Sequence, residues 1–193
     1  MPRSRTNRRL DREQVLTAAL EMIADEGLGK LTIAAVAARL GTSGGHLLYY
    51  FGTRDSLLLE TLRWSESEYA VDRAPILEKA AAGPVDREAV VTFAEIYLAH
   101  DERDPRWQLW LELWARAPYH PELAEAQRGL DAAWHADLVA VLAAVEPSVR
   151  DGELVSERLR AMWDGFSVGI VTGGGTALRA GALEHTRALL GGA

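Results

Sequence analysis

Aromatic residues are the side chains whose spacing points most clearly to a binding site. The chain has six tryptophans, and Trp107, Trp110 and Trp114 fall at positions i, i+3 and i+7 of one predicted helix, so they share a face. The predicted helix before it carries Phe93 and Tyr97. Aromatic rings line small-molecule pockets and attract cations to their faces. The stripe is therefore either part of the core or the wall of a ligand pocket, and both interpretations stay open at this stage.

A pocket in this half of the chain would draw on other side chains as well. Trp64, Tyr69 and Trp134 add aromatic surface, and Glu68, Glu95 or Glu112 could supply negative charge. Aromatic faces combined with a carboxylate would suit a flat or cationic ligand.

Residues that could do catalysis or bind a metal do not converge. Two histidines have acidic neighbours in the sequence: His100 with Asp101 and Asp104, and His135 with Asp131 and Asp137. Their helical or pre-proline settings indicate solvated surface groups, and no nucleophile stands beside them. The segment 27–32, GLGKLT, has the glycines and lysine of a phosphate-binding loop at the wrong spacing and without a preceding strand. With no cysteine in the chain, we expect no enzyme, no cofactor and no metal site.

Charge is distributed unevenly along the chain. The net charge of −7 argues, as an average, against nucleic acid as a partner. However, residues 1–63 carry nine Lys and Arg against seven Asp and Glu, whereas residues 64–193 carry twelve against twenty-one. Most of the positive excess lies in Arg3, Arg5, Arg8, Arg9 and Arg12. Residues 1–9 therefore form a predicted basic, disordered arm, which either follows DNA phosphates or has no partner.

Helical periodicity dominates the sequence, and the predicted fold class is all-α. A long helix is expected from Thr53 toward Pro75, and two helices near the C-terminus, at about 153–172 and 182–190, are separated by a flexible glycine-rich break. No apolar run approaches the roughly 18 residues that a membrane span needs. We expect a cytoplasmic protein with no membrane partner.

Short amphipathic helices near the N-terminus predict a helix-turn-helix. A first helix is expected between Asp11, its cap, and Gly27, which stops it. Two short helices follow, capped by Thr32 and Ser43 and joined by a turn at Gly41. Glycine at such a turn supplies a backbone conformation that other residues resist.

The stretch 41–57, GTSGGHLLYYFGTRDSL, resembles the recognition-helix region of the TetR family of transcriptional regulators. Gly27, Leu31, Thr32 and Ala37 precede it at the family's spacing. The resemblance covers about residues 10–63. Beyond it, residues 107–119 and the pair Asp164–Gly165 look like one common type of TetR ligand-binding domain.

The resemblance implies a division of the chain into two domains. Residues 10–55 would form an N-terminal three-helix helix-turn-helix DNA-binding domain. Residues 56–193 would form a C-terminal helical ligand-binding and dimerisation domain.

A recognition helix exposes small or hydrogen-bonding residues at its leading end and buries apolar residues against the protein. Leu47 and Phe51 are the expected buried side. The expected DNA-binding residues are Thr32, Ser43, Gly44, Gly45, His46, Tyr49, Tyr50 and Arg54, the last of which the resemblance places at a phosphate. As an alternative, Tyr49 and Tyr50 would join Phe51 in an aromatic core.

Two positions depart from the family's pattern. Gly44 stands where the family often has lysine or another polar residue, and Leu48 where tyrosine is usual. Both changes remove potential DNA contacts, so we expect His46 and Tyr49 to carry much of the base readout, helped by DNA shape. They also keep open an alternative, a helical ligand-binding protein that has lost sequence-specific DNA binding.

The two C-terminal helices carry apolar residues that include Met162, Phe166, Ile170 and Leu183. The resemblance implies that these helices form a four-helix dimer interface, whereas the sequence alone allows an intrachain core equally well. A palindromic operator read by one recognition helix per half-site needs a two-fold dimer, which favours the interface.

Together these features predict a ligand-responsive repressor. It would bind a palindromic operator in double-stranded DNA as a homodimer. A small apolar or aromatic inducer would release it by shifting the fourth helix, and would contact Trp64, Phe93, Tyr97, Trp107, Trp110, Trp114 and Trp134.

Overall fold

The computed structural model describes residues 11–146 and 149–191, and within these residues the chain is helical, with a single β-bridge between Val85 and Val145. The helices are α1 (Arg12–Glu26), α2 (Ile33–Arg39), α3 (Gly44–Phe51), α4 (Arg54–Ala82), α5 (Glu88–Tyr97), α6 (Pro105–Arg116), α7 (Pro121–Ala144), α8 (Gly152–Gly169) and α9 (Ala177–Gly191). The predicted all-α class is confirmed. The predicted basic arm, residues 1–9, lies outside the described residues.

Side-chain caps begin the first four helices, as the sequence predicts. The side chain of Asp11 accepts a hydrogen bond from the backbone N–H of Glu13 at 3.3 Å. Thr32, Ser43 and Thr53 each accept from the backbone N–H three residues further on, at 3.0–3.2 Å. Each cap satisfies a helix N–H group that has no partner within the helix. The boundaries of the helix-turn-helix therefore follow from local chemistry.

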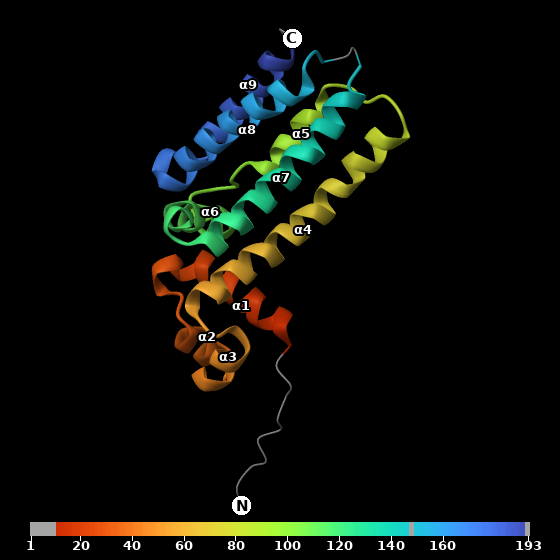
Figure 1. The fold of residues 1–193 in the computed structure, drawn as a ribbon. Coiled ribbons are helices and arrows are strands. Elements are labelled where there is room, and N and C mark those ends of the chain that lie inside the picture. Colours follow the sequence, from red (N-terminus) through yellow and green to blue (C-terminus); the bar gives the residue numbers. More distant parts are fainter. Residues whose placement is uncertain (1–10, 147–148, 192–193) are drawn as a thin grey trace, which may run out of the picture.

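The helix α4 connects the two ends of the molecule (Figure 1). Its first turns bury Leu57 and Leu58 in the N-terminal core, and the rest packs against α5, α6 and α7. The expected domain boundary at residues 55/56 thus falls inside a continuous helix of 29 residues. The helix also continues through Pro75 to Ala82, and Ile76, directly after the proline, is buried.

Helices α5 and α7–α9 run side by side along α4, and α6 lies across their end next to the N-terminal helices (Figure 1). The core between them is rich in aromatic residues, with Phe93 and Trp163 fully buried. The break between α8 and α9 is a π-helical segment, Ile170–Gly174, in which Gly173 has a φ of 107°. That positive φ favours glycine. α9 begins at Ala177, earlier than the sequence indicates.

Candidate nucleic-acid interface and ligand site

The helix α3 turns one apolar face to the protein and one polar, aromatic face to solvent. Leu47 is fully buried and Phe51 is 4% exposed, both in the N-terminal core. Tyr49 is 85% exposed and Tyr50 is 45% exposed. The aromatic-core alternative therefore holds for Phe51 and not for the two tyrosines.

Three rings form a continuous cluster on the outer face of α3. His46 stacks on Tyr50 with ring centroids 5.1 Å apart, and Tyr49 meets Tyr50 edge-on at 5.4 Å. The cluster offers two phenol hydroxyls and an imidazole, which can donate to or accept from base edges and phosphates. Leu48, 49% exposed, lies on the same helix and can offer apolar contact only.

The N-terminal end of α3 leaves room for a partner molecule to come close to its backbone. Thr32 and Ser43 are exposed, and their hydroxyls cap their own helices as acceptors, so each keeps its proton to donate. A Cβ on Gly44 would meet nothing nearer than the Cα of Ala34 at 3.9 Å, and one on Gly45 would meet nothing within 4 Å. The sugar-phosphate backbone of a nucleic acid could therefore come close to this end of the helix.

Arg54, the first residue of α4, is bound to internal partners instead of extending into solvent beside α3. Its Nε donates to the carbonyl of Leu31 at 2.8 Å, and one Nη to that of Leu28 at 3.3 Å. Its other Nη lies 3.4 Å from the carboxylate of Glu112 on α6. The phosphate contact expected for Arg54 would have to compete with these three partners, all of them distant in the sequence.

Arg12, expected to add charge to the basic arm, belongs to α1. Its Nε donates to Glu60 on α4 at 2.9 Å, and its guanidinium lies 5.1 Å from the centre of the Phe51 ring. Its charge is therefore paired.

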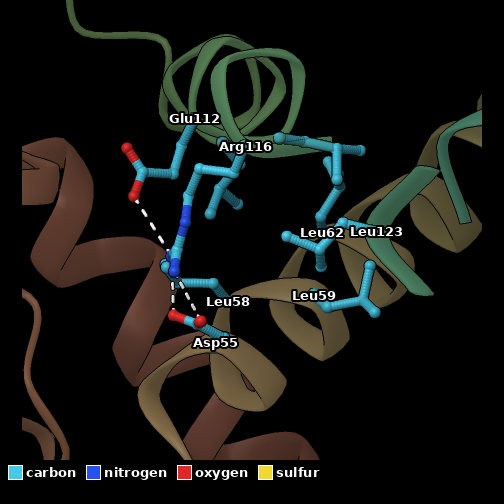
Figure 2. A pocket seen from close by; sticks show the side chains of 9 residues that line it. Asp55, Leu58, Leu59, Leu62, Glu112, Arg116 and Leu123 are labelled. Atoms are coloured by element: carbon cyan, nitrogen blue, oxygen red, sulfur yellow. Dashed lines mark hydrogen bonds and ion pairs between the residues drawn. The ribbon is translucent and has the colours of Figure 1, made fainter. Parts of the chain in front are cut away.

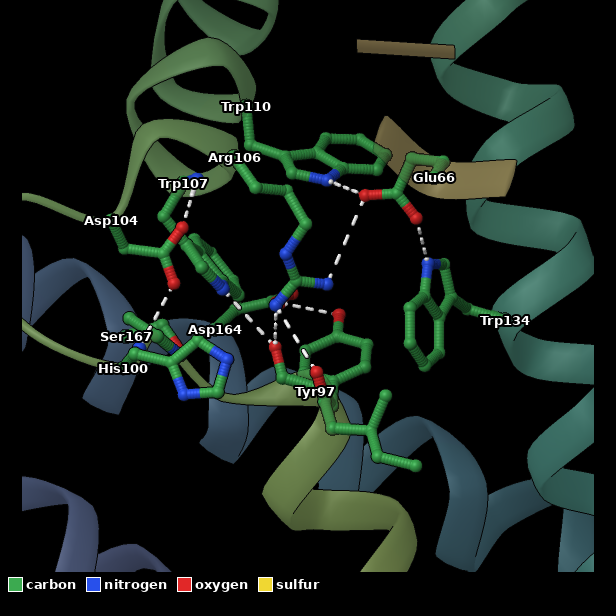
Figure 3. A network of polar contacts seen from close by, with 12 residues as sticks. Glu66, Tyr97, His100, Asp104, Arg106, Trp107, Trp110, Trp134, Asp164 and Ser167 are labelled. Atoms are coloured by element: carbon green, nitrogen blue, oxygen red, sulfur yellow. Dashed lines mark hydrogen bonds and ion pairs between the residues drawn. The ribbon is translucent and has the colours of Figure 1, made fainter. Parts of the chain in front are cut away.

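A narrow cavity of about 10 Å³, about the space that one water molecule needs, lies among α5, α6 and α7. Its lining consists of Tyr97, Arg106, Trp107, Trp110, Trp114, Asp131 and Trp134, which include five of the seven predicted ligand-binding residues. Figure 3 labels five of the lining residues: Tyr97, Arg106, Trp107, Trp110 and Trp134. The three tryptophans of α6 share a face as predicted, and neighbouring pairs lie 5.8 Å apart between ring centroids. We call the aromatic residues of the lining the aromatic cage: Tyr97, Trp107, Trp110, Trp114 and Trp134.

Glu66 of α4 anchors the cage. The indole N–H groups of Trp110 and Trp134 donate to its two carboxylate oxygens at 2.7 and 2.6 Å (Figure 3). The side chain is 4% exposed. A buried carboxylate that accepts two donors fixes the planes of both rings and brings negative charge to the edge of the cage.

The acids that the sequence suggested lie elsewhere. Glu68 and Glu95 are exposed, and Glu112 faces the junction with the N-terminal domain. The carboxylate that does line the cavity is that of Asp131, whose pKa is raised by burial, an effect that the charge of Arg160 offsets only in part. Glu66 could have been found from its spacing, since it lies four residues after buried Leu62 on the inner face of α4.

Arg106 places a cation inside the cage. The side chain is 2% exposed, and its guanidinium carbon lies 3.9 Å from the centre of the Tyr69 ring and 5.7 Å from those of Trp107 and Trp134. These distances fall within the range of cation–π attraction. Sequence reasoning missed this residue because arginine is usually exposed.

Two predicted pocket residues stand outside the cavity. Phe93 is fully buried behind the cage and meets Trp134 edge-on at 5.5 Å. Trp64 is half-buried on α4 and packs against the core. Phe93 therefore supports the cage from behind without lining it.

The opposite face of α6 contacts the N-terminal half of the molecule. Gln108, Glu112 and Arg116 recur every four residues, so they form one stripe. Gln108 accepts a hydrogen bond at 3.3 Å from the backbone of the 3-10 turn after α1, and Glu112 faces Arg54. Arg116 donates to both oxygens of Asp55 at 2.6 and 2.5 Å (Figure 2). A shift of α6 would therefore act directly on the N-terminal domain.

A second narrow cavity, of about 20 Å³, lies beneath this stripe between α4 and α6 (Figure 2). Its apolar lining comes from Leu58, Leu59, Leu62, Leu109, Leu113 and Leu123. The hydrogen bonds from Arg116 lower the pKa of Asp55 at its rim.

The C-terminal helices α8 and α9 leave part of their apolar surface uncovered. Met162, Phe166 and Leu183 are half-buried, and exposed Gly165 lies beside them on α8. Ile170, in contrast, is fully buried by the chain itself. It has no free surface to offer a partner, which corrects its assignment to the interface. It is part of the hydrophobic core, at the start of the π-helical segment between α8 and α9.

The two histidine clusters have structural partners. His135 lies 2.9 Å from the hydroxyl of Ser156 and 2.7 Å from the carboxylate of Glu153. Asp104 caps α6 and accepts from the backbone N–H of His100 at 2.9 Å. Among residues 11–146 and 149–191, no group of three or more His, Asp or Glu side chains could hold a metal ion. Within the same residues, no helix is long and apolar enough to cross a membrane.

Comparison with known proteins identifies the class of protein to which the chain belongs. Residues 15–61 match the family model of bacterial regulatory proteins of the tetR family, and residues 86–192 match the BetI-type transcriptional repressor C-terminal domain. The HTH-type transcriptional regulator BetI of Burkholderia mallei is 32% identical over 164 residues, which are 82% of this chain and 80% of that protein. The counterpart from Stenotrophomonas maltophilia is 28% identical over 80% of this chain and 78% of its own.

Solved structures share the fold. A TetR transcription regulator from Haloarcula marismortui has a TM-score of 0.79 and 22% identity, and the match covers 93% of this chain and 96% of that one. A transcriptional regulator from Saccharomonospora viridis in complex with choline has a TM-score of 0.74 and 23% identity, with 93% of each chain covered.

The fold and the exposed face of α3 are those of a helix-turn-helix DNA-binding regulator, and the relatives are transcriptional regulators, not enzymes. The chain belongs to the TetR family of transcriptional regulators, with a C-terminal domain of the BetI type.

Proposed function

We propose that this regulator is a repressor that binds a palindromic operator as a homodimer in the cytoplasm and is released by a small organic cation of the quaternary ammonium class. The observation that carries the proposal is the aromatic cage with buried Glu66 at its edge and Asp131 in its wall. The sequence predicts an apolar or aromatic ligand, and the two carboxylates narrow that expectation to a cation.

The chemistry of the cage favours a cation whose charged group carries no hydrogen-bond donors, as in a quaternary ammonium. Rings from three helices offer their faces, and cation–π attraction is strongest where water is excluded. The S. viridis regulator, which has the same fold, was solved with choline. Choline is therefore the first compound to test.

Ligand binding is proposed to change DNA binding through a movement of α6. One face of this helix carries Trp107, Trp110 and Trp114 of the cage, and the other carries the stripe that includes Glu112 and Arg116. A ligand that moves the cage residues would move the stripe, because both belong to one short helix. Coupling of this kind requires that the ligand and the operator favour different positions of α6.

The dimer is proposed to form on α8 and α9. Met162, Phe166 and Leu183 are half-buried, as expected for apolar residues that a partner would cover. The hydrogen bond from the indole of Trp163 to the hydroxyl of Thr186, at 2.8 Å, ties the two helices into one unit. A two-fold dimer would present two copies of α3 to successive half-sites.

The DNA interface is proposed to consist of the exposed cluster His46, Tyr49 and Tyr50, with Thr32 and Ser43 at phosphates. Arg54 stays in this set as a prediction, although its present partners are internal. The basic residues before α1 are expected to add salt-dependent affinity.

Calorimetry with choline and with its neutral carbon analogue, 3,3-dimethylbutan-1-ol, tests the ligand class. The two compounds have nearly the same shape and differ by the positive charge. Binding of choline alone supports the proposal. Equal binding of both would show that shape and apolar contact suffice and would refute the requirement for a cation.

Selection of duplex DNA from a random pool tests the operator. Enrichment of a palindrome by the wild-type protein, lost in Tyr49→Ala, supports a dimeric regulator that reads DNA with α3. No enrichment at low salt would instead favour the alternative, a ligand-binding protein that has lost specific DNA binding, which Gly44 and Leu48 keep open.

A further inference from the structure

The cage is already occupied by a positive charge that belongs to the chain. The guanidinium of Arg106 lies over the Tyr69 ring at 3.9 Å and faces Trp107 and Trp134 at 5.7 Å each. Figure 3 shows it at the centre of the network, between Glu66 and Tyr97. This is the place that a bound cation would take, because rings and carboxylate converge there.

The polar contacts of Arg106 hold it only in part. One Nη donates to the backbone carbonyls of Tyr97 and, at 3.3 Å, of Ile96, at the end of α5. The other Nη lies 3.8 Å from Glu66, a loose ion pair. Its Nε is buried without a hydrogen-bond partner among the described residues. A buried charged donor that lacks a partner is costly, so the arrangement can yield to a competing cation.

We propose that Arg106 is an internal occupant of the cation position, and that a ligand cation binds by displacing its guanidinium from the cage. The inference rests on the proposed function, in which the ligand is a cation. Glu66 already accepts two indole N–H groups. The rings close around a single cation, and a second positive charge beside the first would be repelled. Only one of the two therefore occupies the cage at a time.

Displacement would also explain how binding reaches α6. Arg106 lies in the first turn of α6, and its bonds to the end of α5 fix the position of that turn. Release of the guanidinium would free α6 at this end. The stripe of Gln108, Glu112 and Arg116 on the same helix would then change its contacts with the N-terminal domain.

Arg73 provides a matched control. It too is buried and stacks on Trp134, with its guanidinium carbon 4.1 Å from the ring centre. However, it pairs with Asp137 at 2.5 Å and does not belong to the lining of the cavity. An effect of losing a buried arginine in general would appear at both positions, and an effect of vacating the cage only at Arg106.

The test measures binding of two probes, tetramethylammonium and ethylguanidinium, to the wild type, Arg106→Ala and Arg73→Ala by calorimetry. Ethylguanidinium replaces the atoms that Arg106→Ala removes. We expect Arg106→Ala to bind ethylguanidinium where the wild type does not, and to bind tetramethylammonium about 10-fold or more tightly than the wild type. Arg73→Ala should resemble the wild type with both probes.

The outcomes separate the two proposals. If folded Arg106→Ala binds ethylguanidinium but none of the proteins binds tetramethylammonium or choline, the proposed quaternary ammonium ligand is refuted. The proposed displacement of Arg106 by that ligand is then refuted as well. If the wild type binds choline and folded Arg106→Ala gains no affinity for either probe, the displacement alone is overturned.

A measurement on the wild type decides the matter if Arg106→Ala fails to fold. The Nε–H resonance of Arg106, assigned through Arg106→Lys, is followed by nuclear magnetic resonance as choline is added. A large shift toward the position of solvent-exposed arginines supports displacement. Saturation with choline while the resonance keeps its position would overturn it.

Discussion

Replacement of Glu66 by glutamine tests how the cage is held together. The carboxylate is 4% exposed and accepts both indole N–H groups, at 2.7 and 2.6 Å. Glutamine has the same volume but only one acceptor oxygen, so its NH₂ group would face one of the two indole donors. The change removes a hydrogen bond to a charged group and leaves a buried donor unpaired, each costing roughly 1–3 kcal/mol. It also removes the negative charge near Arg106.

We therefore expect Glu66→Gln to lower the free energy of unfolding by about 2–6 kcal/mol, a large part of the ~5–15 kcal/mol that holds a typical domain. Urea unfolding followed by circular dichroism and tryptophan fluorescence measures it. The control is Glu68→Gln, two residues along the same helix and exposed, where a change within about 0.5 kcal/mol is expected. Choline affinity should fall in the first variant alone. A loss below about 1 kcal/mol at Glu66 would refute the role given to its two hydrogen bonds.

Three further predictions follow from the other sites. Tyr49→Ala should weaken operator binding in fluorescence anisotropy by about 10-fold or more, whereas Tyr119→Ala, equally exposed but outside α3, should not; equal losses would contradict the interface. Arg116→Met should lower the unfolding free energy by about 0.5–1 kcal/mol at pH 7. Because Arg116 lowers the native pKa of Asp55, that deficit should shrink as the pH falls below about 4, and an unchanged deficit at pH 3 would contradict the pairing. Phe166→Glu should yield a helical monomer in analytical ultracentrifugation, and a persistent dimer would place the interface elsewhere.

The helix-turn-helix could be predicted in detail because its signals are local. The caps at Asp11, Thr32 and Ser43 lie within three residues of the N–H groups that they accept. The burial of Leu47 and Phe51 follows from a spacing of four on one helix. None of these features needs information from distant parts of the chain.

The cage could be predicted only in part, for a physical reason. Helical spacing places Trp107, Trp110 and Trp114 on one face, but their polar partners come from other helices. Glu66 is 44 residues from Trp110, and sequence rules assign charged side chains to the surface. The same reason explains why the internal partners of Arg54 could not be predicted: its guanidinium binds carbonyls that lie 23 and 26 residues before it in the sequence. Burial of charge depends on tertiary partners that no local pattern reveals.

The central claim is that a cation in the cage releases the regulator from DNA through α6. Titration of choline into the protein bound to its selected, fluorescently labelled operator tests it most directly, with binding to the cage followed in parallel by tryptophan fluorescence. We predict that operator affinity falls over the same choline concentrations at which the cage fills, and that Glu66→Gln needs more choline. Full occupancy of the cage with no change in operator affinity would contradict the account.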